Sequence, residues 1–284
     1  MEPLTIVAIS GAVGGVAGKF VEKAWDQGEK WLSVYFKDHA PKANEKAREN
    51  SLDFLAELAR RVQTLEKQRG TAAASVVEDS LNHPDFSVLL QKAMISSAQT
   101  DNKQKHELLA RLVADRLTKE PDSLFSLSSK LACDAVPMLN VGHMKILGLL
   151  TDLIMVRPVP LVDPSQPKEL ASIRFQRWLI TRLTVYQALT FTNMDFLHLE
   201  SLSCLKWDLI VSRSLQETLS FPKETGITFD YKSFSDSAVG KKIETLWESG
   251  LNHALPTTVG QLIGVYITDM LSGTTTSLDT WGEA

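Results

Sequence analysis

Apolar residues recur at helical intervals through the central part of the chain, residues 82–156. Their i, i+3, i+4, i+7 spacing is typical of the buried face of an amphipathic helix. The pattern predicts four helices, over 84–99, over 105–117, over 124–135 with Pro137 closing it, and over 141–154. In the third helix the apolar side consists of Leu124, Leu127, Leu131 and Ala135. We expect the apolar sides to face inward, so that the four helices pack as one bundle.

The N-terminal segment, residues 3–18, is apolar, rich in glycine and uncharged. It is shorter than the roughly 20 apolar residues needed to span a bilayer, and it lacks the preceding basic residues of a signal peptide. Small residues four apart let two helix backbones approach closely, in lipid or in a protein core. That spacing relates Gly11 to Gly15 and Gly14 to Gly18. The segment is therefore predicted either to be buried in the fold or to associate with a membrane or a second copy.

A long charged helix is predicted over residues 42–69, ending at Gly70. Its apolar residues alternate at three- and four-residue intervals, as in the seam of a coiled coil. This seam consists of Leu55, Leu58, Val62 and Leu65. Two heptads are fewer than the three or four of a sustained coiled coil, so the seam either packs on the core or serves as an association surface.

Four prolines between residues 157 and 168 disfavour both a continuous helix and an internal strand. They mark the clearest boundary in the chain, and they divide it into three structured parts and a tail. These are an N-terminal part over 1–70, a central bundle over 71–156, a C-terminal part over 169–272 and a mobile tail over 273–284.

The C-terminal part combines helical patterns with two candidate strands. Helices are predicted over 169–191, 235–251 and 257–271, and strands over 204–211 and 227–231. Helices followed by two short strands suggest a winged-helix-like module with a β-hairpin. The expected fold is therefore mainly α, a multi-helix bundle with a small C-terminal α+β part.

The composition is that of an ordinary globular protein, with 44% hydrophobic and 23% charged residues among 284. A formal net charge of −4 gives no general attraction to nucleic acid or anionic lipid. Cys133 and Cys204 lie far apart in apolar helical surroundings, which fits buried thiols rather than a disulfide. We expect a cytoplasmic protein, with residues 3–20 as the part that would contact the inner membrane.

Local motifs for catalysis or metal binding are missing from the sequence. The six histidines are scattered without an HxxxH pair, there is no CxxC pair and no GxSxG elbow occurs. The glycines of residues 11–18 have the wrong spacing for a phosphate loop, and Phe20 stands where a Ser or Thr would hold magnesium. We therefore expect no metal, no cofactor and no enzymatic activity, although a pocket built from distant residues would leave no motif.

Three arginines in the helix after the boundary invite a phosphate-binding interpretation: Arg174, Arg177 and Arg182. Guanidinium groups pair well with phosphate oxygens, so these residues are the candidate nucleic-acid contacts. No glycine-rich loop or lysine cluster accompanies them, and a solvated helix face is the alternative. The segment before the first strand carries Asp195 and Glu200 against Lys206, which disfavours DNA as a partner of a winged helix here.

The central stretch resembles the bacterial abortive-infection alpha family. The similarity rests on His83-Pro84-Asp85-Phe86 before an apolar helix ending in Lys92-Ala93-Met94, on residues 139–147, and on residues 197–205 and 255–261. It would cover residues 75–270 with gaps, and it departs from the family pattern at 100–105 and at His143-Met144. The resemblance implies a role in bacterial defence against phage and supplies no catalytic residues.

The sequence thus predicts a non-enzymatic helical protein that acts by self-association or by binding another defence protein. Its expected association surfaces are the glycine-lined face, Gly11, Gly14, Gly15 and Gly18, and the heptad seam, Leu55, Leu58, Val62 and Leu65. If that face pairs helices, Gly14→Leu would abolish association by blocking backbone approach. The alternative is a winged-helix regulatory protein that binds nucleic acid through the three arginines.

Overall fold

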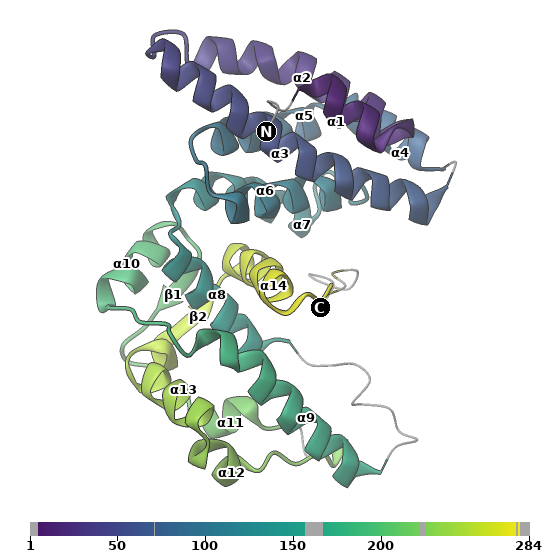
Figure 1. Cartoon of the computed structure of the whole chain (residues 1–284). Coiled ribbons are helices and arrows are strands. Elements are labelled where there is room, and N and C mark those ends of the chain that lie inside the picture. The colour runs from purple at the N-terminus through teal and green to yellow at the C-terminus, as the bar shows by residue number, and fades with distance from the viewer. Residues whose placement is uncertain (1–4, 71, 157–166, 222–224, 277, 279–284) are drawn as a thin grey trace. The chain divides into compact units, whose positions relative to one another are not determined.

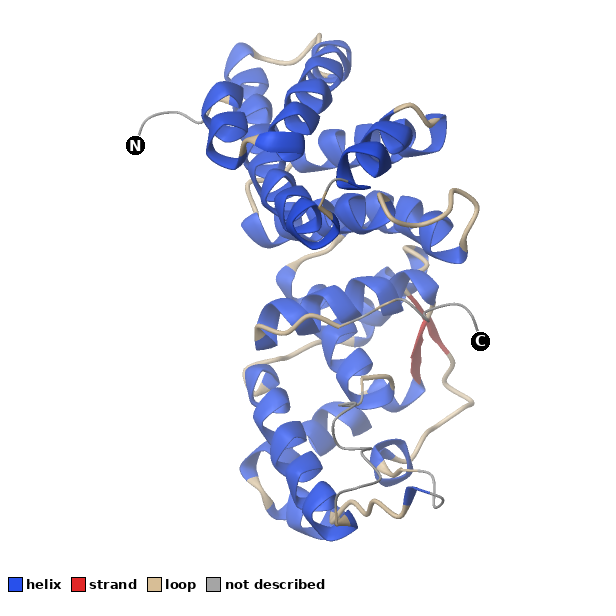
Figure 2. Ribbon diagram, turned by 90° about the vertical axis from the view of Figure 1, so that its right-hand side faces the viewer, coloured by secondary structure: helices blue, strands red, loops and turns tan. Residues whose placement is uncertain are grey.

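The computed structural model describes the chain except residues 1–4, 71, 157–166, 222–224, 277 and 279–284. The described residues are mainly helical and include one two-stranded sheet (Figures 1 and 2). They divide into an N-terminal unit that ends at Met138 and a C-terminal unit that begins at Leu139. The expected mainly α fold with a small C-terminal α+β part is confirmed.

The N-terminal unit contains seven of the described helices. They are α1 (Ile6–Val13), α2 (Gly15–Tyr35), α3 (Pro41–Arg69), α4 (Ala72–Leu81), α5 (Pro84–Ala98), α6 (Lys103–Arg116) and α7 (Leu124–Ala135), followed by a 3-10 turn at Val136–Met138. The long helix α3 is central because it packs against α2, α5 and α6 (Figure 1).

The predicted heptad seam of α3 is part of this core. Leu55, Leu58 and Val62 are fully buried by the chain's own helices, and Leu65 is half-buried. Their burial removes apolar surface from water and stabilises the unit, so they are not available to a second molecule. The prediction of an association surface at this seam is therefore wrong for the three buried residues.

The glycine-rich segment is a helix–turn–helix rather than one continuous helix. Gly14, which separates α1 from α2, and Gly15, which begins α2, have φ values of +62° and +55°. A side chain at Gly18 would lie 2.8 Å from the Ser10 carbonyl oxygen, so this glycine lets α2 approach α1 within the same chain. The four glycines therefore do not form one face. Gly14→Leu would strain the turn, and it does not test association.

Side chains from the end of α3 hold this turn. The Glu66 carboxylate accepts hydrogen bonds from the backbone N–H groups of Val16 and Ala17, at 3.1 and 3.3 Å. Gln63 Nε2 donates to the Val13 carbonyl oxygen at 2.9 Å. A carboxylate at a helix N-terminus satisfies unpaired N–H groups and interacts favourably with the helix dipole.

We expect Glu66→Ala to lower the free energy of unfolding by about 1 kcal/mol, because the first turn of α2 loses its cap. Urea denaturation of the variant measures this loss. Glu45→Ala is the matched control, since Glu45 is exposed on the same helix. Equal stability of the two variants would contradict the capping role.

The C-terminal unit contains α8 (Val141–Ile154), α9 (Lys168–Leu183), α10 (Asn193–Ser201), β1 (Leu205–Trp207), α11 (Leu215–Leu219), α12 (Tyr231–Asp236), α13 (Ala238–Glu248), β2 (Ala254–Pro256) and α14 (Thr258–Ser272), with 3-10 turns at Thr184–Tyr186 and Leu251–His253. Its apolar centre is the long contact between α8 and α14, which lie side by side in Figure 1. Ile146, Leu150 and Ile263 are fully buried in this unit.

The two units do not follow the predicted parts. Helix α8 was expected in the central bundle, yet it belongs to the C-terminal unit because α14 covers its apolar face. The helices of 72–135 instead join those of the first 70 residues. The boundary was predicted at residues 157–168, and residues 157–166 of it lie outside the described residues.

The predicted β-hairpin is also wrong. β1 pairs antiparallel with β2, so that Leu205 lies opposite Pro256 and Trp207 opposite Ala254. Residues 227–230 form no strand, and Tyr231 begins α12. The two strands come from segments far apart in sequence, so they do not form the wing of a winged helix.

None of the described helices is both long and apolar enough to cross a membrane.

Candidate functional site

The two thiols are buried and lie in different units. Burial raises the pKa of the Cys133 thiol far above its usual range and that of Cys204 to about 12. A thiol with a raised pKa is protonated at neutral pH and is a poor nucleophile. Among the described residues, no group of three or more His, Cys, Asp or Glu side chains is arranged to hold a metal ion.

A buried ion pair links α8 and α9. The Asp152 carboxylate accepts hydrogen bonds from Arg182 Nε and, at 2.7 Å, from the Tyr186 hydroxyl. Burial raises the pKa of Asp152 to about 6, although Arg182 and Tyr186 favour the charged form and so oppose this rise. The Arg182 guanidinium also lies 5.4 Å from the ring centre of Trp178.

Arg182 therefore cannot contact nucleic acid as predicted, because it is 93% buried and bound to Asp152. Arg174 and Arg177 are exposed on α9. Of the three predicted contacts, the structure leaves these two at the surface.

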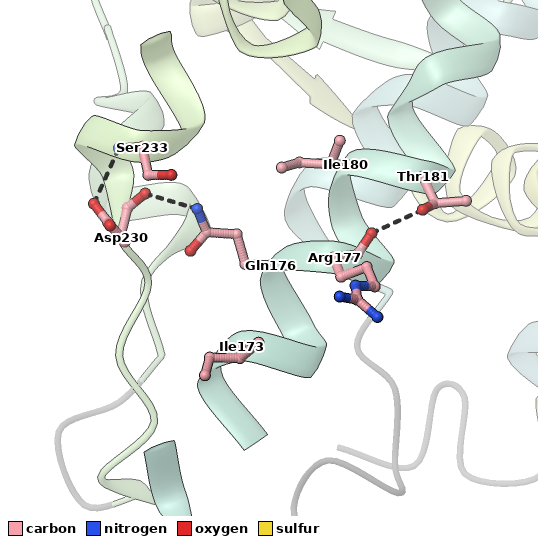
Figure 3. A pocket seen from close by; sticks show the side chains of 7 residues that line it. All are labelled: Ile173, Gln176, Arg177, Ile180, Thr181, Asp230 and Ser233. Atoms are coloured by element: carbon pink, nitrogen blue, oxygen red, sulfur yellow. Dashed lines mark hydrogen bonds between the residues drawn. The ribbon is translucent and has the colours of Figure 1, made fainter. Parts of the chain in front are cut away.

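Arg177 lines a groove between α9 and α12, the α9–α12 groove, with a cavity volume of about 450 Å³ (Figure 3). Gln176 Nε2 crosses the groove to the Asp230 carbonyl oxygen at 3.3 Å, and the Asp230 carboxylate accepts from the Ser233 N–H at 3.0 Å. The lining residues are Ile173, Gln176, Arg177, Ile180, Thr181, Asp230 and Ser233. Ile173 is 62% exposed, so the groove offers apolar surface beside a cation.

Helix α7 has the opposite orientation to the predicted one. Leu124, Leu127 and Leu131 are 44%, 47% and 55% exposed, whereas Ser126 and Ser129 are fully buried. Ser129 Oγ donates to the Phe125 carbonyl oxygen at 2.8 Å, and Ser126 Oγ donates to that of Glu120. Buried hydroxyls with such partners carry little penalty. The prediction that the leucines face the core is wrong.

Small side chains explain why the serine side faces inward. Ser96 Oγ of α5 donates to the Cys133 carbonyl oxygen of α7 at 3.0 Å, which requires the two helices to lie close together. Serine, alanine and cysteine fit such an approach, whereas leucine would hold the helices apart. The close packing of α5 on α7 therefore leaves the leucines outside.

The exposed residues of α7 continue beyond its last turn. We define the outer α7 face as Leu124, Leu127, Leu131, Asp134 and Met138, which alternate at intervals of three and four residues. Met138 is 60% exposed, and Val88 of α5 adds a further exposed aliphatic side chain to the unit. Asp134 forms an ion pair with Lys92 of α5, and its side chain remains 52% exposed.

A histidine–aspartate pair that no sequence motif indicated joins the starts of α8 and α10. His143 Nε2 lies 3.1 Å from Asp195 Oδ1, and the His143 ring stacks on His198 with centroids 4.7 Å apart. His143 also belongs to a capping box with Asn140, as Asp195 does with Thr192. The capping residues Asn140 and Thr192 are visible in the sequence, but the contact between the helices is not.

A protein-family model matches residues 18–248 of the chain, and the description of that family names no activity, ligand or partner. The chain matches none of the curated proteins and none of the solved structures with which it was compared. Because the matched segment covers more than half of the sequence, the chain belongs to this family.

Proposed function

We propose that the protein acts by self-association through the outer α7 face. One observation carries this proposal: an ordered amphipathic helix turns three leucines to the solvent and its serines to the core. Single exposed apolar residues are common in monomers, but a continuous apolar stripe at helical spacing is typical of an interaction surface. The 3-4 alternation is the spacing with which one helix packs along another.

The size of the surface suggests how strong the association is. A stable interface of standard size buries about 800 Å² on each partner. Three half-exposed leucines with Met138 and Val88 supply less apolar area than that. We therefore expect a weak association that depends on protein concentration, which suits a protein that assembles only when it accumulates.

The biological role is proposed from the resemblance to the abortive-infection alpha family. In this proposal the chain is a non-enzymatic component of bacterial anti-phage defence in the cytoplasm, and its assembly is the active event. Comparing phage plaque counts on bacteria that express the wild type or the association-defective variant below tests the role. Equal protection by both proteins would contradict assembly as the active event.

We expect Leu131→Glu to abolish association, because it places a charge in the middle of the apolar stripe, where pairing would desolvate it. Light scattering coupled to size-exclusion chromatography, at several loading concentrations, measures the change in mass. Val34→Glu is the matched control, since Val34 is 77% exposed on α2. If both variants associate like the wild type, the outer α7 face is not the interface.

A further inference from the structure

Building on the proposed self-association, we infer that the outer α7 face of one copy docks on the α9–α12 groove of another. The contact would then join two different surfaces, rather than two copies of the same surface. Two observations support it, a match of spacing and a match of charge between α7 and α9.

Three exposed residues of α9 and the half-buried Ile180 repeat the spacing of the outer α7 face. Leu170, Ile173, Arg177 and Ile180 follow one another at intervals of three, four and three residues, as Leu124, Leu127, Leu131 and Asp134 do. In a parallel pairing that keeps these intervals in step, Asp134 lies opposite Ile180 and Leu131 opposite Arg177, so the two charges do not meet. With Asp134 opposite Arg177, an antiparallel pairing places Leu131 by Ile180 and Met138 by Ile173 at matching intervals. The antiparallel direction therefore brings aliphatic side chains together and also pairs the charges.

The charges on the two faces are complementary. Within the described part of the chain, no ion-pair partner is found for Arg177. Asp134 has Lys92 as a partner, but such exposed pairs contribute about 0–1 kcal/mol and exchange readily. A guanidinium can bind a carboxylate with two parallel hydrogen bonds, which a lysine cannot do. Asp230 also lines the groove, and its carboxylate is engaged by the Ser233 N–H.

Pairing of α7 with a second α7 lacks this complementarity. Each copy would bring Asp134 to the seam with only its own Lys92 as a partner, because the opposite outer α7 face carries no cation. The α9 seam supplies Arg177 at the corresponding place. A contact between two different surfaces leaves a free α7 face and a free groove at the ends, so copies assemble into rings or chains.

A charge exchange tests the contact. We expect Asp134→Arg and Arg177→Glu each to weaken association about tenfold or more, and the double variant to recover most of the loss. Sedimentation velocity of the full chain over a concentration series gives the association constants. Lys92→Met is the control, because it breaks only the pair within the chain and should leave association nearly unchanged. Failure of the double variant to recover, with both single variants weakened, would overturn the inference.

A mixing experiment separates this inference from the proposed function. Leu131→Glu retains its groove and Arg177→Glu retains its outer α7 face, so each is defective in association alone, whereas their mixture should form one-to-one dimers. If Arg177→Glu associates alone like the wild type while Leu131→Glu does not, α7 pairs with itself. That result would overturn the docking inference and leave self-association through α7 standing.

Discussion

Replacing Arg182 with methionine is expected to lower the free energy of unfolding of the C-terminal unit by about 3–5 kcal/mol at pH 8. Methionine keeps much of the volume but removes the guanidinium that Arg182 brings to the buried Asp152 carboxylate. Removing one partner of a buried ion pair is far less favourable than keeping the pair or replacing both partners by neutral groups. Urea denaturation followed by circular dichroism measures the loss.

The effect of Arg182→Met should shrink in acid. In the wild type, burial raises the pKa of Asp152 from 3.8 to about 6. At a pH between these two values the folded state therefore holds a proton that the unfolded state has lost. This group therefore stabilises the fold below about pH 4, and that contribution disappears as the pH rises through about 6. Without Arg182 the pKa rises further, so at pH 5 the carboxyl is neutral and needs no cation.

Arg177→Met is the matched control for this experiment, because Arg177 lies on the same helix but is exposed. Its effect on stability should be within about 0.5 kcal/mol, as for most surface substitutions. A loss for Arg182→Met that is small, or that is the same at pH 5 and pH 8, would contradict the role given to the buried pair.

Gly260→Ala is expected to destabilise the C-terminal unit by about 3 kcal/mol or more, because no rotamer change can relieve the contact that it creates. A Cβ atom at this position would lie 1.7 Å from the Cys204 backbone oxygen. The same oxygen accepts a hydrogen bond from the Thr257 N–H at 3.1 Å, and Thr257 caps α14. Moving the first turn of α14 away would break both interactions.

Gly11→Ala provides the control for Gly260→Ala. Gly11 lies in α1, and a methyl group added there would meet no atom within 4 Å, so alanine should be neutral or slightly stabilising by its helix propensity. Thermal unfolding of the two variants compares them directly. Equal melting temperatures would mean that α14 does not approach the start of β1 as closely as described.

Local signals in the sequence predicted the helices well. Pro84 occupies the first turn of α5, Asn140 caps α8 and Gly70 ends α3, as the propensities of these residues imply. Each of these features depends on a few neighbouring residues, which is why the sequence alone reveals it. The buried heptad seam of α3 was one of two interpretations that the sequence left open.

Features that depend on distant segments were not predictable. The partner of β1 lies at Ala254–Pro256, and the partner of Asp152 lies at Arg182, although both contacts join segments that carry no shared motif. The orientation of α7 was predicted wrongly because the hydrophobic pattern treats serine as polar. In the structure, Ser126 and Ser129 satisfy their hydroxyls with nearby carbonyl oxygens and fit where leucine does not.

The outward leucines of α7 are proposed to bring copies of this chain together. Sedimentation equilibrium of the wild-type protein over a hundredfold range of concentration, on the order of 1 to 100 μM, tests it most directly. We expect an average mass that rises above that of the monomer as the concentration increases, and that stays at the monomer value for Leu131→Glu. A wild-type mass equal to the monomer at every concentration would contradict the claim.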